Sequence, residues 1–92
     1  MNIPGGWDIV DMPAGPIPEK VAAAFADATS SLMGAQYIPL LYCGEQVVRG
    51  INYMLICEQK IMASGAPKHI VQMTINVSES GSSSIVSISQ LV

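Results

Sequence analysis

Two cysteines and one histidine are the residues of this sequence whose types could carry covalent chemistry. Cys43 or Cys57 could supply a thiolate nucleophile, and His69 could supply the base that activates it. Such a pair also needs an orienting group and hydrogen-bond donors for an oxyanion, and the sequence signals neither. His69 instead opens a strand pattern beside Lys68, which is typical of a solvated residue. We therefore expect that the chain is not an enzyme.

Metal and cofactor chemistry has no matching pattern. Cys43 and Cys57 are too far apart for a C-x-x-C zinc or redox pair, and the sequence carries no Gly-rich phosphate loop. We expect no metal and no cofactor.

Two alternatives stay open for the cysteines. They are free thiols in the core, or, if a hairpin is centred near Gly50, they lie nearly opposite each other and form a cross-strand disulfide.

The composition is that of one small globular domain. The 92 residues are 50% apolar and 12% charged, which favours a packed core over a disordered chain. A chain of this length supports a single domain, residues 1–92. The net charge is -3 and the four Lys and Arg residues are scattered, so we expect no nucleic-acid partner.

Neither a membrane span nor a secretory leader is predicted. No apolar run reaches the ~18–20 residues that a bilayer requires. The start of the chain also lacks the basic and apolar blocks of a signal peptide. We expect a soluble cytoplasmic protein with no membrane partner. Secretion stays open as the alternative if a signal peptide has been removed.

One helix is expected in the N-terminal part. A short strand pattern over residues 7–12 ends at the Pro-rich stretch 13–16, which cannot continue a ladder. Apolar residues then recur at helical spacing, with Pro18 suited to the first turn and Gly34 to the C-terminal cap. The apolar stripe comprises Val21, Phe25, Ala28 and Leu32. The pattern predicts a helix of about four turns.

The remainder of the chain alternates between strand and turn signals. β-Branched, aromatic and aliphatic residues predict strands over residues 37–48, 51–62, 69–78 and 84–92. Short connections favour an antiparallel meander, and the helix must bury its apolar stripe against one sheet face. The predicted fold class is therefore α+β, one long helix packed on a four- to five-stranded antiparallel sheet.

A five-residue pattern marks the tip of the first expected hairpin. Gln46-Val47-Val48-Arg49-Gly50 fits the Q-x-V-x-G signature of the cystatins, and Ile51-Asn52-Tyr53 continues it. Gly5-Gly6-Trp7 is similar to the N-terminal glycine region of that family, and residues 21–26 are similar to its helix motif in plant members. The chain thus resembles the cystatin/stefin family, with features similar to plant and type 1 members, over nearly its whole length.

This resemblance implies a cystatin-like fold, a curved antiparallel sheet that grips the helix, and an activity without chemistry. Such proteins inhibit papain-like, cathepsin-type cysteine proteases by covering the active-site cleft with the N-terminal segment and two hairpin loops. The implied protease-binding residues are Gly5, Gly6, Gln46, Val47, Val48, Arg49 and Gly50. Trp7 is more typical of a packing residue or strand opener.

The second loop departs from the family pattern. Residues 79–83 offer glutamate, glycine and serines where the family commonly has a Pro-Trp or Leu-Pro pair. Arg49 also replaces the usual small residue of the first loop. A cystatin-fold binding or structural module that inhibits nothing is therefore kept as the alternative to the inhibitor. We expect a monomer, and a strand-swapped dimer stays open.

Overall fold

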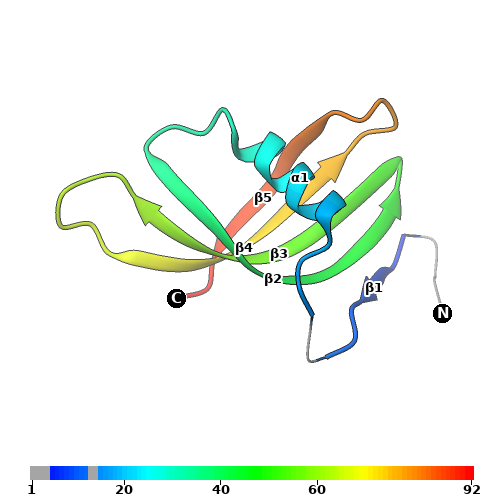
Figure 1. Cartoon of the computed structure of the whole chain (residues 1–92), viewed down its shortest axis with the longest axis horizontal. Helices are drawn as coiled ribbons and strands as arrows, with labels where there is room; N and C mark the ends of the chain where they lie inside the picture. The colour runs from blue at the N-terminus through cyan, green and yellow to red at the C-terminus, as the bar shows by residue number, and fades with distance from the viewer. Residues whose placement is uncertain (1–4, 13–14) are drawn as a thin grey trace.

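All five strand patterns of the sequence become strands of one antiparallel sheet. The computed structural model describes residues 5–12 and 15–92, and the strands follow one another across the sheet in chain order (Figure 1). They are β1 (Trp7–Ile9), β2 (Ala35–Val48), β3 (Gly50–Ile61), β4 (Lys68–Val77) and β5 (Ser83–Gln90). Every neighbouring pair is antiparallel, so the predicted meander and the α+β class are confirmed.

The first strand is shorter than the pattern over residues 7–12 predicts. β1 ends at Ile9, where its partner strand β2 reaches a bulge. A bulge bends the strand that carries it and interrupts the ladder. The predicted break over residues 13–16 begins at Pro13 and Ala14, which lie outside the described residues.

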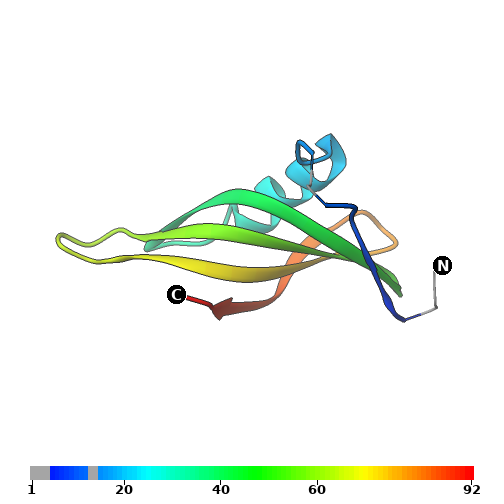
Figure 2. The same cartoon turned by 90° about the horizontal axis from the view of Figure 1, so that it is seen from below.

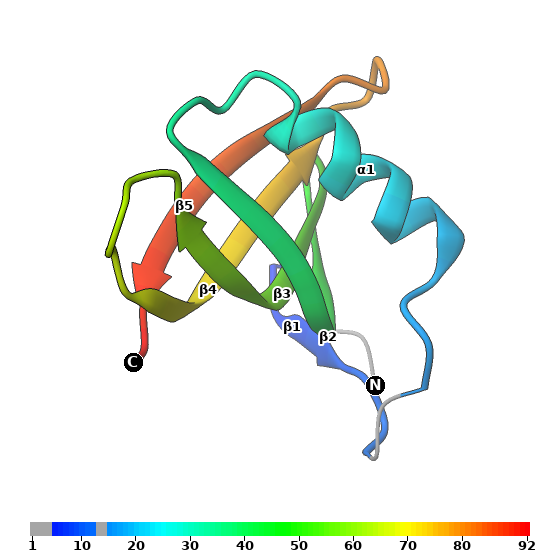
Figure 3. The ribbon, with the colours of Figure 1, turned by 60° about the vertical axis from the view of Figure 1, so that its left-hand side comes forward.

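The helix α1 (Glu19–Thr29) covers one face of the sheet, whose strands bend around it (Figure 3). Its buried side chains are those of Val21, Ala24, Phe25 and Ala28. Three of the four predicted stripe residues therefore lie in the core. From the sheet, the residues buried with them are Tyr42, Tyr53, Leu55, Cys57, Val71, Met73 and Ile75.

The helix is shorter than predicted, and Leu32 is not part of its stripe. α1 ends at Thr29, and Leu32 is 36% exposed in the connection to β2. The Thr29 hydroxyl donates to the Phe25 carbonyl at 2.8 Å, and the Ser30 hydroxyl donates to the Asp27 carbonyl at 2.7 Å. Hydroxyl side chains of this kind compete with the helix ladder for its last carbonyls, and the helix stops there.

Gly34 is consequently not the helix cap. It has a φ of 84° and lies just before β2, where its carbonyl accepts a hydrogen bond from the Met62 N–H at 2.9 Å. Gly34 thus closes the pairing of β2 with β3 at the end away from their hairpin tip.

Two irregularities in β2 produce the curvature of the sheet. Register shifts lie between Pro39 and Leu41 and between Tyr42 and Gly44. Extra residues in one strand of an antiparallel pair bend it and increase its twist. Pro39 is tolerated because β1 pairs only with residues 44–46, so this part of β2 is a sheet edge.

The cysteines do not lie opposite each other. Val48 pairs with Gly50, which centres the hairpin on Arg49, one residue before Gly50, and the bulges of β2 shift the register further until Cys57 pairs with Pro39. Both thiols are free, which corrects the cross-strand disulfide alternative and confirms free thiols. Burial raises the pKa of the Cys57 thiol to about 12, with the neighbouring Cys43 adding to the effect.

The long axis of the molecule separates two groups of loops. Strand β1, the β2–β3 tip and the β4–β5 connection lie at one end, and the β3–β4 connection lies at the other (Figure 2). Within the described ranges, no helix is long and apolar enough to cross a membrane.

Candidate functional site

The tip of the β2–β3 hairpin is a tight turn with Arg49 at its apex. Gly50 has a φ of 91°, in the left-handed region that L side chains rarely adopt. A Cβ atom on residue 50 would also collide with the carbonyl of Val77 at the end of β4. Only glycine satisfies both conditions, so the last residue of the Q-x-V-x-G pattern has a structural reason to be there.

The apolar side chains of this tip face solvent. Val47 is 45% exposed and Val48 is 40% exposed, and Arg49 is exposed between Val48 and Gly50. β-Branched residues in a strand hold their side chains in few rotamers, so they lose little entropy on contact with another surface. The tip therefore presents a stiff apolar surface with one cation.

The N-terminal glycine pair lies beside this tip. Trp7 opens β1 and pairs with Gln46, and the Gln46 amide nitrogen donates a 2.7 Å hydrogen bond to the Gly5 carbonyl. Gly5 is exposed and Gly6 is half-buried. Gly44 permits the close approach of β1, because a Cβ atom there would collide with the Asp8 carbonyl.

The structure thus brings all seven sequence-predicted binding residues to one end of the molecule (Figure 1). We call this set the wedge; it comprises Gly5, Gly6 and residues 46–50.

Three side-chain amides, one of them from the wedge, form a connected row across the sheet. Asn76 in β4 donates to the Asn52 oxygen at 2.9 Å, and Asn52 in β3 donates to the Gln46 oxygen at 3.0 Å. The Gln46 nitrogen then donates to the Gly5 carbonyl. We call Asn76, Asn52 and Gln46 the amide row. It connects β4, β3 and β2 to the glycine pair.

Sequence reasoning missed Asn52 and Asn76 as parts of the site. In the sequence Asn52 only continues the hairpin pattern, and Asn76 only falls within the strand predicted over residues 69–78. A signal was present, because asparagine is depleted in strands and both residues sit inside β-branched and aliphatic runs. Their pairing, Asn52 with Asn76, depends on the register between β3 and β4, which a single sequence does not reveal.

The second loop, expected over residues 79–83, comprises residues 78–82 between β4 and β5, and it is closed by its own hydrogen bonds. The Ser78 N–H donates to the Ser82 carbonyl at 2.9 Å, and the Gly81 N–H donates to the Ser78 carbonyl at 2.9 Å. The Ser78 hydroxyl oxygen accepts the Ser82 N–H at 3.1 Å and lies 2.9 Å from the Ser80 hydroxyl oxygen. The serines therefore shape the turn, and no large apolar side chain stands at this position.

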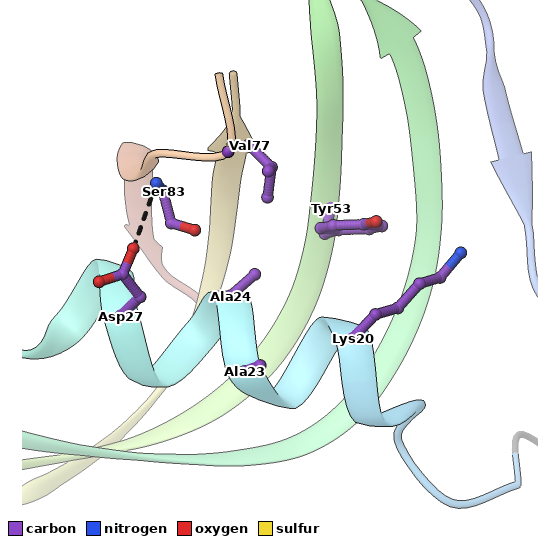
Figure 4. Close-up of a pocket in the computed structure, with 8 residues that line it drawn as sticks. Lys20, Ala23, Ala24, Asp27, Tyr53, Val77 and Ser83 are labelled. Atoms are coloured by element: carbon purple, nitrogen blue, oxygen red, sulfur yellow. Dashed lines mark hydrogen bonds between the residues drawn. The ribbon is translucent and has the colours of Figure 1, made fainter. Parts of the chain in front are cut away.

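A shallow hollow lies between α1 and the sheet below the second loop (Figure 4). Its lining residues are Lys20, Ala23, Ala24, Asp27, Tyr53, Val77, Gly81 and Ser83. The Asp27 carboxylate accepts a 3.3 Å hydrogen bond from the Ser83 N–H, which ties the start of β5 to the helix. This contact holds the first residue of β5, directly after the second loop, against α1.

The residues considered for covalent chemistry are not part of the wedge, and Cys43 is a half-buried free thiol of β2. Cys57 is fully buried, and the His69 Nδ1 lies 3.2 Å from the Val92 carbonyl oxygen, beside the C-terminal residues. In residues 5–12 and 15–92, no group of three or more His, Cys, Asp or Glu side chains is placed to hold a metal ion.

No protein-family model, curated protein or solved structure matches this chain. The residues and the geometry of the wedge are thus what indicates its role.

Proposed function

We propose that this protein inhibits papain-like, cathepsin-type cysteine proteases by filling the active-site cleft with the wedge. The observation that carries the proposal is the hydrogen bond from Gln46 to the Gly5 carbonyl, at 2.7 Å. It joins Gly5 and Gly6, which we call the glycine segment, to the hairpin whose exposed residues are Val47, Val48 and Arg49. Two elements far apart in sequence thereby form one continuous surface, as the resemblance to the cystatins implies.

Inhibition of this kind needs no reaction. A narrow apolar edge that enters the cleft excludes substrate from the catalytic cysteine without forming a bond to it. A preformed edge loses little conformational entropy on docking, so a standard interface of about 800 Å² per partner can support tight binding. We propose the same cystatin-like fold and a one-to-one complex of the monomer with the protease.

A second role is favoured by the second loop. Residues 78–82 hold hydrogen-bonded serines where an aromatic or proline anchor would add contact area. Aromatic anchors carry much of the energy of protein interfaces. A cystatin-fold binding or structural module that inhibits no protease is therefore the alternative, and an inhibition assay separates the two.

The test compares two variants that introduce the same charge at opposite ends of the molecule. Val48→Asp places a carboxylate on the exposed tip, where docking would bury it without a partner. Met62→Asp, at the exposed β3–β4 connection, is the matched control. The inhibition constant for papain is measured with a fluorogenic peptide substrate.

We expect Val48→Asp to weaken inhibition by about 30-fold or more, the range of an interface hot spot. Met62→Asp should leave inhibition within about twofold of the unmodified protein, because it lies far from the wedge. Equal inhibition by the two variants would show that the hairpin tip is not part of the binding surface.

A further inference from the structure

The amide row has a direction, and that direction ends on the glycine segment. A backbone carbonyl can only accept a hydrogen bond, so Gly5 requires the nitrogen of Gln46 to point toward it. The Gln46 oxygen must then face Asn52, which presents its nitrogen, and the Asn52 oxygen in turn accepts from Asn76. Every amide in the row therefore donates toward Gly5, and such chains of hydrogen bonds polarise one another.

In the part of the chain that the structure describes, strand pairing begins only after the glycine segment. β1 is only three residues long, and its pairing with β2 begins at Trp7, two residues after Gly5. Glycine residues next to a short strand stay loose unless something ties them down. The Gln46 side chain makes that tie, and it does so from the strand that carries Val47 and Val48.

We infer that Gln46 is a positioning residue, which with Asn52 and Asn76 behind it holds the glycine segment against the hairpin before any partner binds. Gln46 itself is half-buried, whereas Val47 and Val48 are exposed. Gln46 thus contributes to binding indirectly. It orders the glycine segment in the free protein, so the segment loses less conformational entropy on docking. The part of the inference that concerns affinity rests on the proposed protease inhibition; the part that concerns the free protein does not.

The free protein provides the first test. Gln46→Met keeps an unbranched side chain of similar length and removes the donor. Gln59→Met is the matched control, because Gln59 also makes a hydrogen bond across β2 and β3, to the Tyr37 hydroxyl at 2.8 Å, near the other end of the same strand pair. Backbone ¹⁵N relaxation of Gly5 and Gly6 is measured in the unmodified protein and in both variants.

We expect order parameters of about 0.8 for these two glycines in the unmodified protein and in Gln59→Met, and values below about 0.6 in Gln46→Met. The spectra outside the glycine segment report whether each variant is folded. Should Gln46→Met fail to fold, Asn52→Ala serves as the second variant, since it removes the support of Gln46 and should loosen the same two glycines. Glycines that stay ordered in the folded variant, or that are already mobile in the unmodified protein, would overturn the inference.

The second test is a double-mutant cycle in the papain assay. Gly6→Glu adds a bulky charge that pushes the glycine segment away from a docked surface. If Gln46 acts through this segment, Gln46→Met should weaken inhibition about five- to tenfold in the unmodified background and less than about twofold in the Gly6→Glu background. Equal losses in both backgrounds would show that Gln46 acts independently of the segment and would overturn its positioning role.

The two tests separate the failure of the inference from that of the proposed function. If the unmodified protein does not inhibit papain, the protease proposal fails, and the relaxation measurement alone decides whether Gln46 orders the glycine segment. If papain is inhibited but Gln46→Met leaves Gly5 and Gly6 ordered, the inhibitor proposal stands and the positioning role does not.

Discussion

Gly50 lies so close to the carbonyl of Val77 that a Cβ atom on residue 50 would collide with it. Gly50 begins β3 at the first hairpin tip, and Val77 ends β4 directly before the second loop. The two loops that share this end of the molecule are therefore in backbone contact. A change at Gly50 alters the hairpin and its neighbour together.

Gly50→Ala tests this contact. The substitution places a side chain at a φ of 91° and against backbone that cannot rotate away, so we expect a loss of about 3 kcal/mol in the free energy of unfolding. Gly65→Ala is the control, because Gly65 has a φ of 74° with no atom within 4 Å of the added Cβ, and it should cost about 1 kcal/mol. Urea denaturation followed by circular dichroism measures both; equal losses would mean that the contact with Val77 is unimportant.

The sequence was sufficient to predict the elements and their order. Strong periodicity and clear turn signals gave the strands after residue 34 to within about two residues, and the helix stripe was right at Val21, Phe25 and Ala28. The hairpin pattern also located the exposed tip correctly. These features depend on local residue preference, which a single sequence carries.

The features that were wrong or missed depend on side-chain hydrogen bonds and on strand register. The helix end was wrong because Thr29 and Ser30 cap the last carbonyls before the apolar stripe is complete. Of the two alternatives for the cysteines, the one that places Cys43 opposite Cys57 fails, because the centre of the hairpin and the two bulges of β2 set a different register. The amide row requires the register of three strands at once, so the two asparagines are unusual in their strand patterns but their alignment with Gln46 could not be predicted.

The core should be most sensitive at Leu55. Its side chain is fully buried between the sheet and α1, so Leu55→Ala should lower the free energy of unfolding by about 3 kcal/mol through lost burial and a cavity. Leu40→Ala is the matched control, since Leu40 is exposed at the bulge of β2, and its change should stay within about 0.5 kcal/mol. Chemical denaturation gives both values, and a small loss at Leu55 would contradict the described core.

Stability should fall at alkaline pH. Burial raises the pKa of Cys57 from 9.0 to about 12 and that of Tyr42 from 10.0 to about 12, with the Glu45 carboxylate adding to the shift at Tyr42. The unfolded chain releases these protons at lower pH than the folded chain. From about pH 9 to 12 the folded state therefore binds more protons than the unfolded state does. Its stability declines as the pH rises through that range.

Denaturation midpoints at pH 7, 9 and 10.5 measure this decline. Cys57→Ala should be less stable at pH 7 because of the cavity it leaves, yet its further loss between pH 9 and 10.5 should be smaller than that of the unmodified protein. An identical pH dependence in the two proteins would show that the Cys57 thiol does not contribute to it.

The most direct measurement is a titration of active papain with the unmodified protein, combined with mass spectrometry of the recovered chain. Occlusion by a preformed wedge predicts loss of peptide hydrolysis that is complete near one equivalent or at low micromolar excess, with the chain recovered uncleaved and without an adduct. Papain that stays fully active with tens of micromolar protein present, or a chain that is cut within residues 46–50 as a substrate, would contradict the account.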